Sequence, residues 1–425
     1  MKIIINSILL ALLLVAFSYC KKDKIEEVEQ PKTLSISITT KNISEVGDIF
    51  SINLNSNTNW TINSDENWCK VDITSGSNDT AVNITVEGNP TYIERTSIVT
   101  ISGIDVDTVI LTVIQEKKHY ITINSPTNSS NWQTWQSYRI KWDDNISENV
   151  KIELFKGTSL MKIISSNTPS DSLYIWTIPD NLLEGNDYYI KIMSVSNENA
   201  SVISDNFSIT TGNPNVVFDY DGNEYNTIQI GNQVWTVENL KVTHYPDGTP
   251  IPLVTDDVLW GNLQDNNTDD AYCFYNNDPD SEYGALYTWS AAMGDNAVSS
   301  YTNPSGVQGV CPDGWHLPSF AEWTELSGYL GDSYIAGGKM KEVGTTHWNS
   351  PNEGADNSSG FTGLPGGRRS SDDGTFDHLG NIGIWWGTDT DGNSIIYNTL
   401  YYLTTEISFI GGQKSRGYSV RCIKD

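Results

Sequence analysis

The first half of the chain consists of short segments in which apolar and polar residues alternate. Between residues 34 and 117 seven such segments follow one another, FSINLN and VNITVE among them. Because neighbouring side chains of a strand point to opposite faces, this alternation predicts strands with one buried face. Turn-forming residues separate the segments, as in SGSN at 75–78 and GNP at 88–90. The block 34–117 is therefore predicted to be an all-β sandwich.

The same pattern continues in a second block, residues 118–211. Strand-like segments surround Trp142 and Trp176, and YYIKI at 188–192 repeats the alternation. We predict a second all-β sandwich here. The sequence GNPN at 212–215 is rich in turn formers and is interpreted as a linker.

Residues 216–425 combine strand patterns with two predicted helices. The DG at 221–222 is typical of a hairpin turn between alternating strands. Ser319 and Glu322 form a capping box that begins a helix, and Gly331 ends it. The apolar segment YGALYTWSAAM, residues 283–293, predicts a second short helix. The chain is thus expected to be multidomain, with two all-β sandwiches followed by an α+β domain.

The N-terminus has the pattern of an export signal. An apolar run at 3–17 is shorter than a comfortable membrane span and ends close to Cys20. The sequence AFSYC at 16–20 resembles a bacterial lipobox, which implies cleavage before Cys20 and a diacylglycerol on its thiol. We expect residues 1–19 to be a lipoprotein signal peptide and the charged residues 20–33 to be a tether.

Composition and charge narrow the classes of function. The 425 residues include 53 acidic and 25 basic side chains, a formal net charge of −28. This balance argues against nucleic-acid binding, which needs Lys and Arg to neutralise phosphates. It also argues against adhesion to anionic lipid headgroups, so membrane contact is expected through the lipid anchor only. A content of 38% hydrophobic and 11% aromatic residues is too high for a disordered chain.

Motifs in both sandwich blocks resemble known modules. The block 34–117 resembles a BACON domain, an immunoglobulin-like module often found beside carbohydrate-active regions. Its motifs are NW at 59–60, NW at 67–68, Arg95 and VIQ at 113–115. The block 118–211 is similar to the immunoglobulin-like N-terminal domain of cell-wall synthesis proteins of the Kre/Knh type. Its motifs are Trp142, WTIP at 176–179 and DNF at 205–207.

The third block, residues 216–425, resembles the Fibrobacter succinogenes major paralogous domain over its full length. The motifs are GNQVW at 231–235, ENL at 238–240, YGALY at 283–287, CPDGWHLP at 311–318, GF at 360–361, LPGGR at 364–368, WW at 385–386 and GYSVRC at 417–422. The family is similar in pattern to C-type-lectin-like and sulfatase-modifying-factor-like folds, which implies such a fold here. It has no settled activity, so the resemblance predicts a fold rather than a function.

Four cysteines follow the N-terminal segment. Cys311 and Cys422 both lie in motifs of the C-terminal resemblance, and such folds commonly tie a late strand to a central segment. The resemblance therefore implies a disulfide between Cys311 and Cys422. Cys273 then stays unpaired or bridges to Cys69 in a different module, and we favour a free thiol at both positions.

The chain carries no recognisable catalytic motif. It has no G-x-S-x-G and no H-E-x-x-H, and its five histidines are scattered. Among 53 acidic residues some pair always lies at a glycosidase-like spacing, so Asp and Glu pairs are uninformative. The triplets EPN, QPD and WND of calcium-dependent sugar-binding lectins do not occur either. We expect a protein that is not an enzyme.

Aromatic residues supply the candidate ligand site. Neighbouring residues of a strand face opposite sides, so at most one of Trp385 and Trp386 packs into a single core. The other either stacks on a sugar ring or is covered by a loop. Arg368 either binds a carboxylate ligand or pairs with the acids Asp372 and Asp373.

An acidic segment supplies the candidate metal site. Residues 242–338 contain 14 acids and no Lys or Arg. Ca²⁺ bound by several oxygens would offset their mutual repulsion, with Asp278 and Asp280 as candidate ligands. The alternative is a solvated acidic face without a cation. At 219–223 the sequence DYDGN imitates part of a calcium loop, but the hairpin interpretation is favoured.

These features together predict a lipid-anchored, non-catalytic protein of the outer membrane or cell surface. Its C-terminal domain is expected to bind glycans or other cell-envelope components. One alternative is a structural or adhesion protein of the surface. The other is a polysaccharide-active enzyme that uses Asp and Glu pairs.

Overall fold

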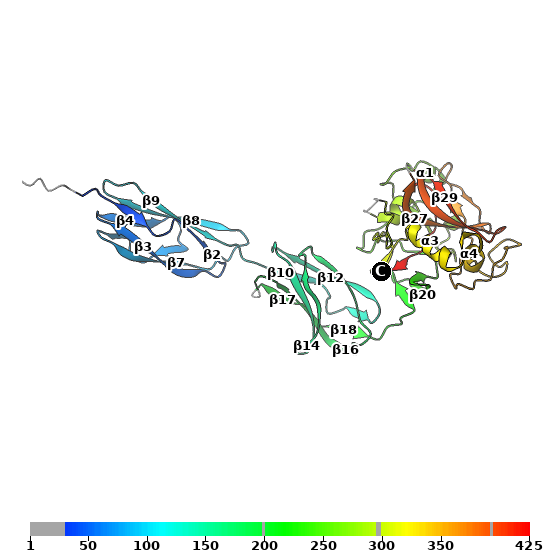
Figure 1. Cartoon of the computed structure of the whole chain (residues 1–425), viewed down its shortest axis with the longest axis horizontal. Coiled ribbons are helices and arrows are strands. Elements are labelled where there is room, and N and C mark those ends of the chain that lie inside the picture. The colour runs from blue at the N-terminus through cyan, green and yellow to red at the C-terminus, as the bar shows by residue number, and fades with distance from the viewer. Residues whose placement is uncertain (1–29, 198–199, 295–298, 392–393) are drawn as a thin grey trace, which may run out of the picture. The chain divides into compact units, whose positions relative to one another are not determined.

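The computed structural model describes residues 30–425 except 198–199, 295–298 and 392–393 (Figure 1). Residues 1–19 and Cys20, to which the sequence assigns export and lipidation, lie outside the described residues. The chain divides into two compact units, residues 1–118 and 119–425. In the part that the structure describes, no helix combines the length and the hydrophobicity needed to cross a membrane.

The first domain is a sandwich of two sheets. Its strands are β1 Leu34–Ile36, β2 Thr40–Ile43, β3 Asp48–Ser56, β4 Trp60–Ser64, β5 Cys69–Val71, β6 Ser75–Gly76, β7 Thr80–Val86, β8 Arg95–Gly103 and β9 Val109–Gln115. One sheet has the order β1-β3-β7-β5 and the other β2-β9-β8-β4-β6. Alternate residues of β8, Val99 and Ile101, are fully buried between them. The predicted all-β sandwich is confirmed.

Three of the BACON-like motif residues, Trp68, Arg95 and Gln115, lie together in this sandwich. The guanidinium of Arg95 lies 4.2 Å from the ring centroid of Trp68 and donates to Oε1 of Gln115 at 2.8 Å. Gln115 is fully buried and donates in turn to the carbonyl oxygens of Ser44 and Glu87. The motif therefore has a structural role: it ties loop carbonyls to the last strand.

The second domain is also a sandwich. Its strands are β10 Ile121–Ser125, β11 Asn131–Gln133, β12 Ser137–Asp144, β13 Val150–Lys156, β14 Ser159–Thr168, β15 Leu173–Thr177, β16 Gly185–Ser194, β17 Ser201–Ile203 and β18 Phe207–Thr210. The sheets have the orders β10-β12-β15 and β11-β18-β16-β13-β14, and β17 pairs with β16. The motif residues Trp142 and Trp176 are buried in the shared core with Phe207. This second sandwich is confirmed as well.

The C-terminal domain contains all the helices among the described residues, and most of it is built from short strands and irregular segments. Its strands are β19 Val216–Phe218, β20 Glu224–Ile230, β21 Gln233–Thr236, β22 Tyr272–Phe274, β23 Ala285–Tyr287, β24 Trp315–His316, β25 Arg368–Arg369, β26 Phe376–Asp377, β27 Ile382–Asp391, β28 Ser394–Tyr401, β29 Ile407–Gly412 and β30 Ile423–Lys424. Its helices are α1 Asp257–Gly261, the 3₁₀ helix η1 Tyr275–Asn277, α2 Trp289–Met293, α3 Phe320–Tyr329 and α4 Ser333–Met340. The two main sheets are β19-β20-β21-β30-β24 and β27-β28-β29.

The structure shows what three local signals in the C-terminal sequence form. The hairpin at Gly222 is confirmed: β19 pairs with β20, and the glycine has a φ of 80° that side chains disfavour. The capping box is confirmed at the start of α3, where the Ser319 side chain accepts from the backbone N–H of Glu322. The imitation calcium loop is a hydrogen-bonded turn, in which Asp219 accepts from the backbone and side chain of Asn223.

The predicted helix at 283–293 was wrong in its first half. Residues 285–287 form β23, and the helix α2 begins only after Thr288, whose side chain accepts from the N–H of Ala291. Every residue from 284 to 293 is buried. A segment buried on all sides has no apolar period, so hydrophobicity alone could not distinguish strand from helix.

Candidate functional site

The sheet β27-β28-β29 has a closed face, which packs against α3 and α4, and an opposite face that a second core cluster covers only in part. On the closed face, Trp385, Leu400 and Ile407 join one core cluster with residues of α3 and α4, including Trp323 and Met340. Figure 1 shows these two helices beside the strands of this sheet. Alternation along each strand sends the intervening side chains to the opposite face. A groove lies on the part of this opposite face that the second core cluster leaves open.

The groove has a volume of about 300 Å³. The register of the sheet places Thr399 of β28 beside Ile384 of β27 and Ser408 of β29. A neighbouring row places Tyr401 beside Ile382. The groove is lined by Arg368, His378, Ile382, Ile384, Tyr397, Thr399, Tyr401, Thr404, Glu406, Ser408 and Ile410. It therefore combines an aromatic and aliphatic surface with hydroxyl groups and charged side chains.

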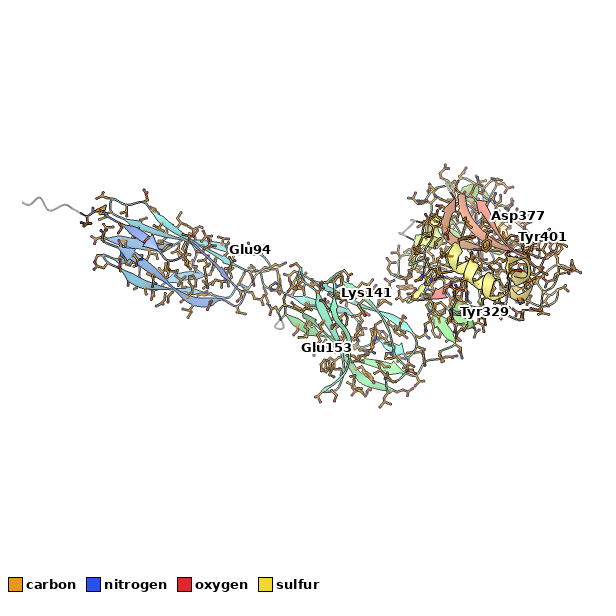
Figure 2. All side chains as sticks on the ribbon, in the orientation of Figure 1. Glu94, Lys141, Glu153, Tyr329, Asp377 and Tyr401 are labelled. Carbon is orange, nitrogen blue, oxygen red and sulfur yellow. A yellow bond between two sulfur atoms is a disulfide. The ribbon has the colours of Figure 1, made fainter. Side chains whose placement is uncertain are left out.

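Arg368 lies at the groove and is held by an ion pair. Its Nε and Nη2 donate to the two carboxylate oxygens of Asp377 at 2.8 and 3.1 Å, and this pairing raises the pKa of Arg368 above its ordinary value. Figure 2 labels Asp377 and the groove residue Tyr401. The expected partners Asp372 and Asp373 were wrong. Arg368 on β25 lies opposite Asp377 on β26, in the register of a two-stranded hairpin that the sequence pattern did not reveal.

The connection between β28 and β29, residues 402–406, closes one end of the groove and is anchored by a buried lysine. Lys341 is fully buried. Its Nζ donates to the carbonyl oxygens of Tyr401, Thr404 and Glu353 at 3.2, 2.8 and 2.8 Å. Because an ammonium has three hydrogens, this arrangement satisfies all of them and fixes the backbone from which the groove residues project.

Three polar side chains at this end of the groove have no partner among the described residues. They are the hydroxyl groups of Thr404 and Ser408 and the carboxylate of Glu406. Glu406 is exposed, whereas Thr404 and Ser408 are half-buried. Their hydrogen-bonding capacity is therefore available to a ligand.

The structure corrects the interpretation of the tryptophan pair. Trp385 and Trp386 are both 0% exposed. Trp385 packs in the closed-face core, and its Nε1 donates to Asn239. Trp386 packs in the other core cluster of the domain, and its Nε1 donates to the carbonyl of Tyr287. The strand is buried on both sides by separate cores, so neither indole offers a surface for stacking.

The acidic segment does not assemble a metal site in the described residues. Asp278 and Asp280 are exposed, and the carboxylate of Asp278 accepts from the backbone N–H of Asp280 in a local turn. Nowhere in the described residues do three or more His, Cys, Asp or Glu side chains gather as metal ligands would. The two candidate calcium ligands are turn residues here.

The cysteines are arranged as the resemblance implied. A disulfide joins Cys311 to Cys422, with the two Cα atoms 5.9 Å apart. Cys69 and Cys273 are free and buried. Burial raises the pKa of the Cys273 thiol to about 12, which keeps it protonated and unreactive.

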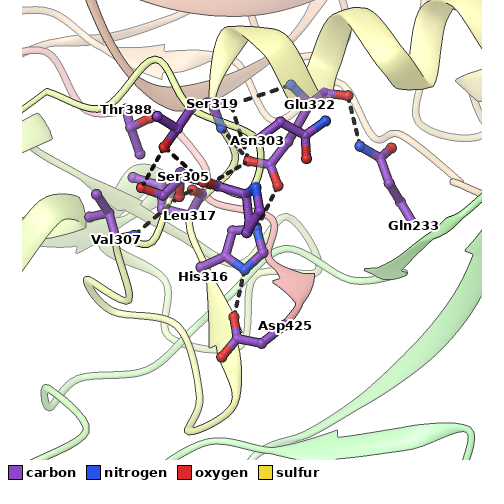
Figure 3. Close-up of polar contacts among 12 residues, drawn as sticks. Gln233, Asn303, Ser305, Val307, His316, Leu317, Ser319, Glu322, Thr388 and Asp425 are labelled. Atoms are coloured by element: carbon purple, nitrogen blue, oxygen red, sulfur yellow. Dashed lines mark hydrogen bonds and ion pairs between the residues drawn. The ribbon is translucent and has the colours of Figure 1, made fainter.

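A buried histidine between two carboxylates has the composition of a catalytic group, and Figure 3 shows its surroundings. His316 is 3% exposed. Its Nε2 lies 2.7 Å from Glu322 and its Nδ1 lies 2.6 Å from Asp425. Burial lowers the pKa of His316, but these hydrogen bonds outweigh burial and raise it to about 9.

This histidine is structural. Both ring nitrogens are occupied, and the second carboxylate oxygen of Glu322 accepts from the backbone N–H of Ser319 in the capping box. A general base needs a free nitrogen within reach of substrate. The network instead joins the start of α3 to the segment around Asp425.

The groove was not found by sequence reasoning apart from Arg368. Alternation in SIIYNTLY at 394–401 and ISFIGG at 407–412 shows which residues share a face of each strand. It does not show that these strands pair with β27, nor which face a helix covers. Those facts depend on contacts between distant segments.

Three family models match the chain. Residues 228–424 match the Fibrobacter succinogenes major domain. Residues 125–209 match the Kre9/KNH-like N-terminal Ig-like domain, and residues 29–118 match the Viral BACON domain. A comparison with curated proteins gave no match.

Solved structures resemble parts of the chain. A GH5 xyloglucanase of Bacteroides ovatus, solved with a XXXG heptasaccharide, is 27% identical over 24% of this chain and 22% of its own length, with a TM-score of 0.20. A Bacteroides thetaiotaomicron protein is 13% identical over 23% of this chain and 98% of its own, with a TM-score of 0.16. The titin fragment I67–I69 is 11% identical over 44% and 66%, with a TM-score of 0.31.

TM-scores this low support no argument about the function of the chain. The immunoglobulin-like matches point to a non-catalytic structural or adhesion protein, and none of the three family matches is to a catalytic family. In chain order, the protein combines regions that match a BACON domain, a Kre9/KNH-like Ig-like domain and a Fibrobacter succinogenes major domain, as their motifs indicated.

Proposed function

We propose that this protein is a lipid-anchored, non-catalytic binding protein of the cell surface, and that the groove on the β27-β28-β29 sheet binds a glycan or another envelope component. One observation carries the proposal: apolar Ile382 and Ile410 lie in the same groove as the unpartnered hydroxyls of Thr404 and Ser408. Sugars present both C–H faces and hydroxyl groups, and binding sites for them combine aromatic or aliphatic surface with a few polar groups.

The proposal assigns different roles to the domains. The two sandwiches serve as spacers between the anchor at Cys20 and the C-terminal domain. For the C-terminal domain we propose the C-type-lectin-like or sulfatase-modifying-factor-like fold that its motifs resemble. Its short helices α3 and α4 beside small antiparallel sheets support that assignment. Binding does not require the calcium chemistry of lectins, because the groove residues supply hydrogen bonds themselves.

The groove can be tested with the purified full chain on an array of plant, host and bacterial glycans. We expect binding to a defined subset, and loss of this binding in Ser408→Phe, which places a bulky ring in the groove. Ser358→Phe is the matched control, because Ser358 is exposed elsewhere in the same domain. A flat array, or equal binding by both variants, would reject the groove as the site.

The anchor needs a separate test. Cys20→Ala should yield an unprocessed or soluble form, because lipid attachment requires the thiol. Membrane fractionation of cells that express each form measures this. Normal membrane association of the alanine variant would contradict the anchor.

A structural or adhesion role is the second candidate, and the immunoglobulin-like matches favour it. It predicts that deletion of the protein weakens cell cohesion while no soluble glycan binds. An enzyme would instead turn over a polysaccharide, and product analysis on the same array would detect that activity.

A further inference from the structure

We infer that the groove selects a neutral sugar residue with neighbouring hydroxyl groups and discriminates against acidic sugars, an inference that rests on the proposed function. The charges that face the groove decide this. They come from Arg368 on one side and from Glu406 on the other, with Lys341 beneath the connection 402–406.

The positive charges at the groove are already engaged. Both carboxylate oxygens of Asp377 accept from Arg368. Lys341 is fully buried and donates to three backbone carbonyl oxygens. Because Asp377 already neutralises the charge of Arg368, a carboxylate ligand would find no unpaired cation among the described lining residues.

The negative charge at the groove is free. Glu406 is exposed and has no partner among the described residues. An ionised carboxylate only accepts hydrogen bonds, and its two oxygens suit two adjacent donors. Neighbouring sugar hydroxyls provide such a pair of donors, and charge-assisted hydrogen bonds of this kind are stronger than neutral ones. A uronic acid would bring a second carboxylate close to Glu406, and the two negative charges would repel each other. The net charge of −28 of the whole chain adds to this repulsion.

The rest of the groove fits the remainder of a pyranose ring. Ile382 and Ile410 provide aliphatic contact for its C–H groups, and Ser408 offers a hydroxyl that both donates and accepts. The volume of about 300 Å³ lies at the lower end of ligand pockets, which indicates one or two sugar units rather than a long chain segment.

The test uses the full chain and matched pairs of oligosaccharides. The neutral probes are cellohexaose, mannohexaose and maltohexaose, and each is compared with its form oxidised at C6 to the carboxylate. Calorimetry measures the affinity of each pair in low and high salt. We expect at least one neutral probe to bind, with the oxidised form about tenfold weaker at low salt and less so at high salt.

Glu406→Gln keeps the size of the side chain and removes its charge. We expect it to weaken neutral binding about three- to fivefold and to reduce the discrimination against the oxidised form. Glu224→Gln is the control, because Glu224 is an exposed acid on β20 outside the groove. Tighter binding of the oxidised forms, or no change in either affinity in Glu406→Gln, would overturn the inference and leave the proposed function standing. No binding of any probe would overturn the inference, and only a flat glycan array as well would reject the proposed function.

Discussion

The sandwiches and the C-terminal domain bury their polar backbone in different ways. In the first sandwich, long ladders such as β3 with β7 and β8 with β9 pair the backbone groups. The core is correspondingly aliphatic, and no Lys or Arg is buried in the described parts of either sandwich. The C-terminal domain has short strands and long irregular segments, and it buries Lys341, Arg369 and Arg421 completely.

These buried cations replace the missing ladders. Arg421 donates to Asn239 and to the carbonyl oxygens of Thr236 and Phe361 at 2.7, 2.8 and 2.9 Å. Arg369 donates in the same way to the carbonyl oxygens of Val254 and Gly374. A buried carbonyl without a partner is costly, and one guanidinium with five donors satisfies several of them. Irregular structure can therefore be stable when cations, rather than neighbouring strands, meet its carbonyls.

The largest expected effect comes from the disulfide, which only the C-terminal domain has among the described residues. It closes a loop across a sequence separation of 111 residues. The double variant Cys311→Ser, Cys422→Ser should lower the free energy of unfolding of this domain by up to about 4–5 kcal/mol in the chain-entropy model. Thermal unfolding monitored by regional hydrogen exchange measures it. Cys69 of the first sandwich is a free thiol, so this double variant should leave the stability of that sandwich unchanged. An equal loss of stability there would contradict the comparison.

The next largest effect tests the cations directly. Arg421→Met should destabilise the C-terminal domain by about 3–5 kcal/mol, because several buried acceptors lose their donor together. Denaturant unfolding of the full chain measures this free energy. Lys241→Met, which removes an exposed cation of the same domain, should cost less than about 0.5 kcal/mol. Similar values for the two variants would show that burial of the charge is unimportant.

A smaller effect depends on pH. The pKa of His316 is raised to about 9 in the folded domain. Its stabilising contribution is therefore full below the ordinary pKa near 6.5 and is lost as the pH rises through about 9. Between pH 7 and 9.5 the domain should lose on the order of 2 kcal/mol of stability, and His316→Gln should abolish this slope.

The acids around His316 set the pH window for that measurement. Glu322 and Asp425 contact the ring directly. Asp389 lies near Glu322, and burial raises its pKa to about 6, so its titration is nearly complete at pH 7. A stability that stays constant from pH 7 to 9.5 would contradict the assigned role of His316.

The smallest effect concerns the sandwich. Ile101→Val in the buried face of β8 should cost only about 1 kcal/mol, since it removes one methylene from an aliphatic core. The equally conservative Arg421→Lys should cost more in its own domain, because an ammonium cannot reproduce the planar donors of a guanidinium. Chemical denaturation of both variants compares the two cores on one scale. If Arg421→Lys cost less than Ile101→Val, the two cores would not differ as we describe.

The same contrast explains what the sequence could predict. The alternating positions Val99 and Ile101 are the buried ones, so the two-residue period of apolar residues was sufficient to predict the sandwiches. The capped helix at Ser319 was predictable because its signal lies within four residues. In contrast, α4 contains Gly337 and Gly338, which disfavour helices. They are there because an added Cβ would lie 2.4 Å from the carbonyl oxygen of Glu406 and 2.5 Å from that of Gly354.

The candidate site was less predictable for the same reason. Arg368 was identified, but its partner Asp377 and the groove residues Tyr401 and Ser408 come together only through sheet pairing. One of Trp385 and Trp386 was expected either to reach a ligand or to be covered by a loop, because a strand buried between two separate cores has no signature in a local pattern. Long-range pairing, not residue type, decides which side chains reach a ligand.

The place of β30 in the sheet has a consequence for biosynthesis. Its residues 423–424 lie between β21 and β24, and the adjacent Cys422 holds the disulfide. This interior position of the sheet therefore stays vacant while a ribosome is still making the preceding two hundred or so residues of the domain. Both sandwiches can complete their sheets during synthesis, whereas the C-terminal domain can close only after its last strand has emerged.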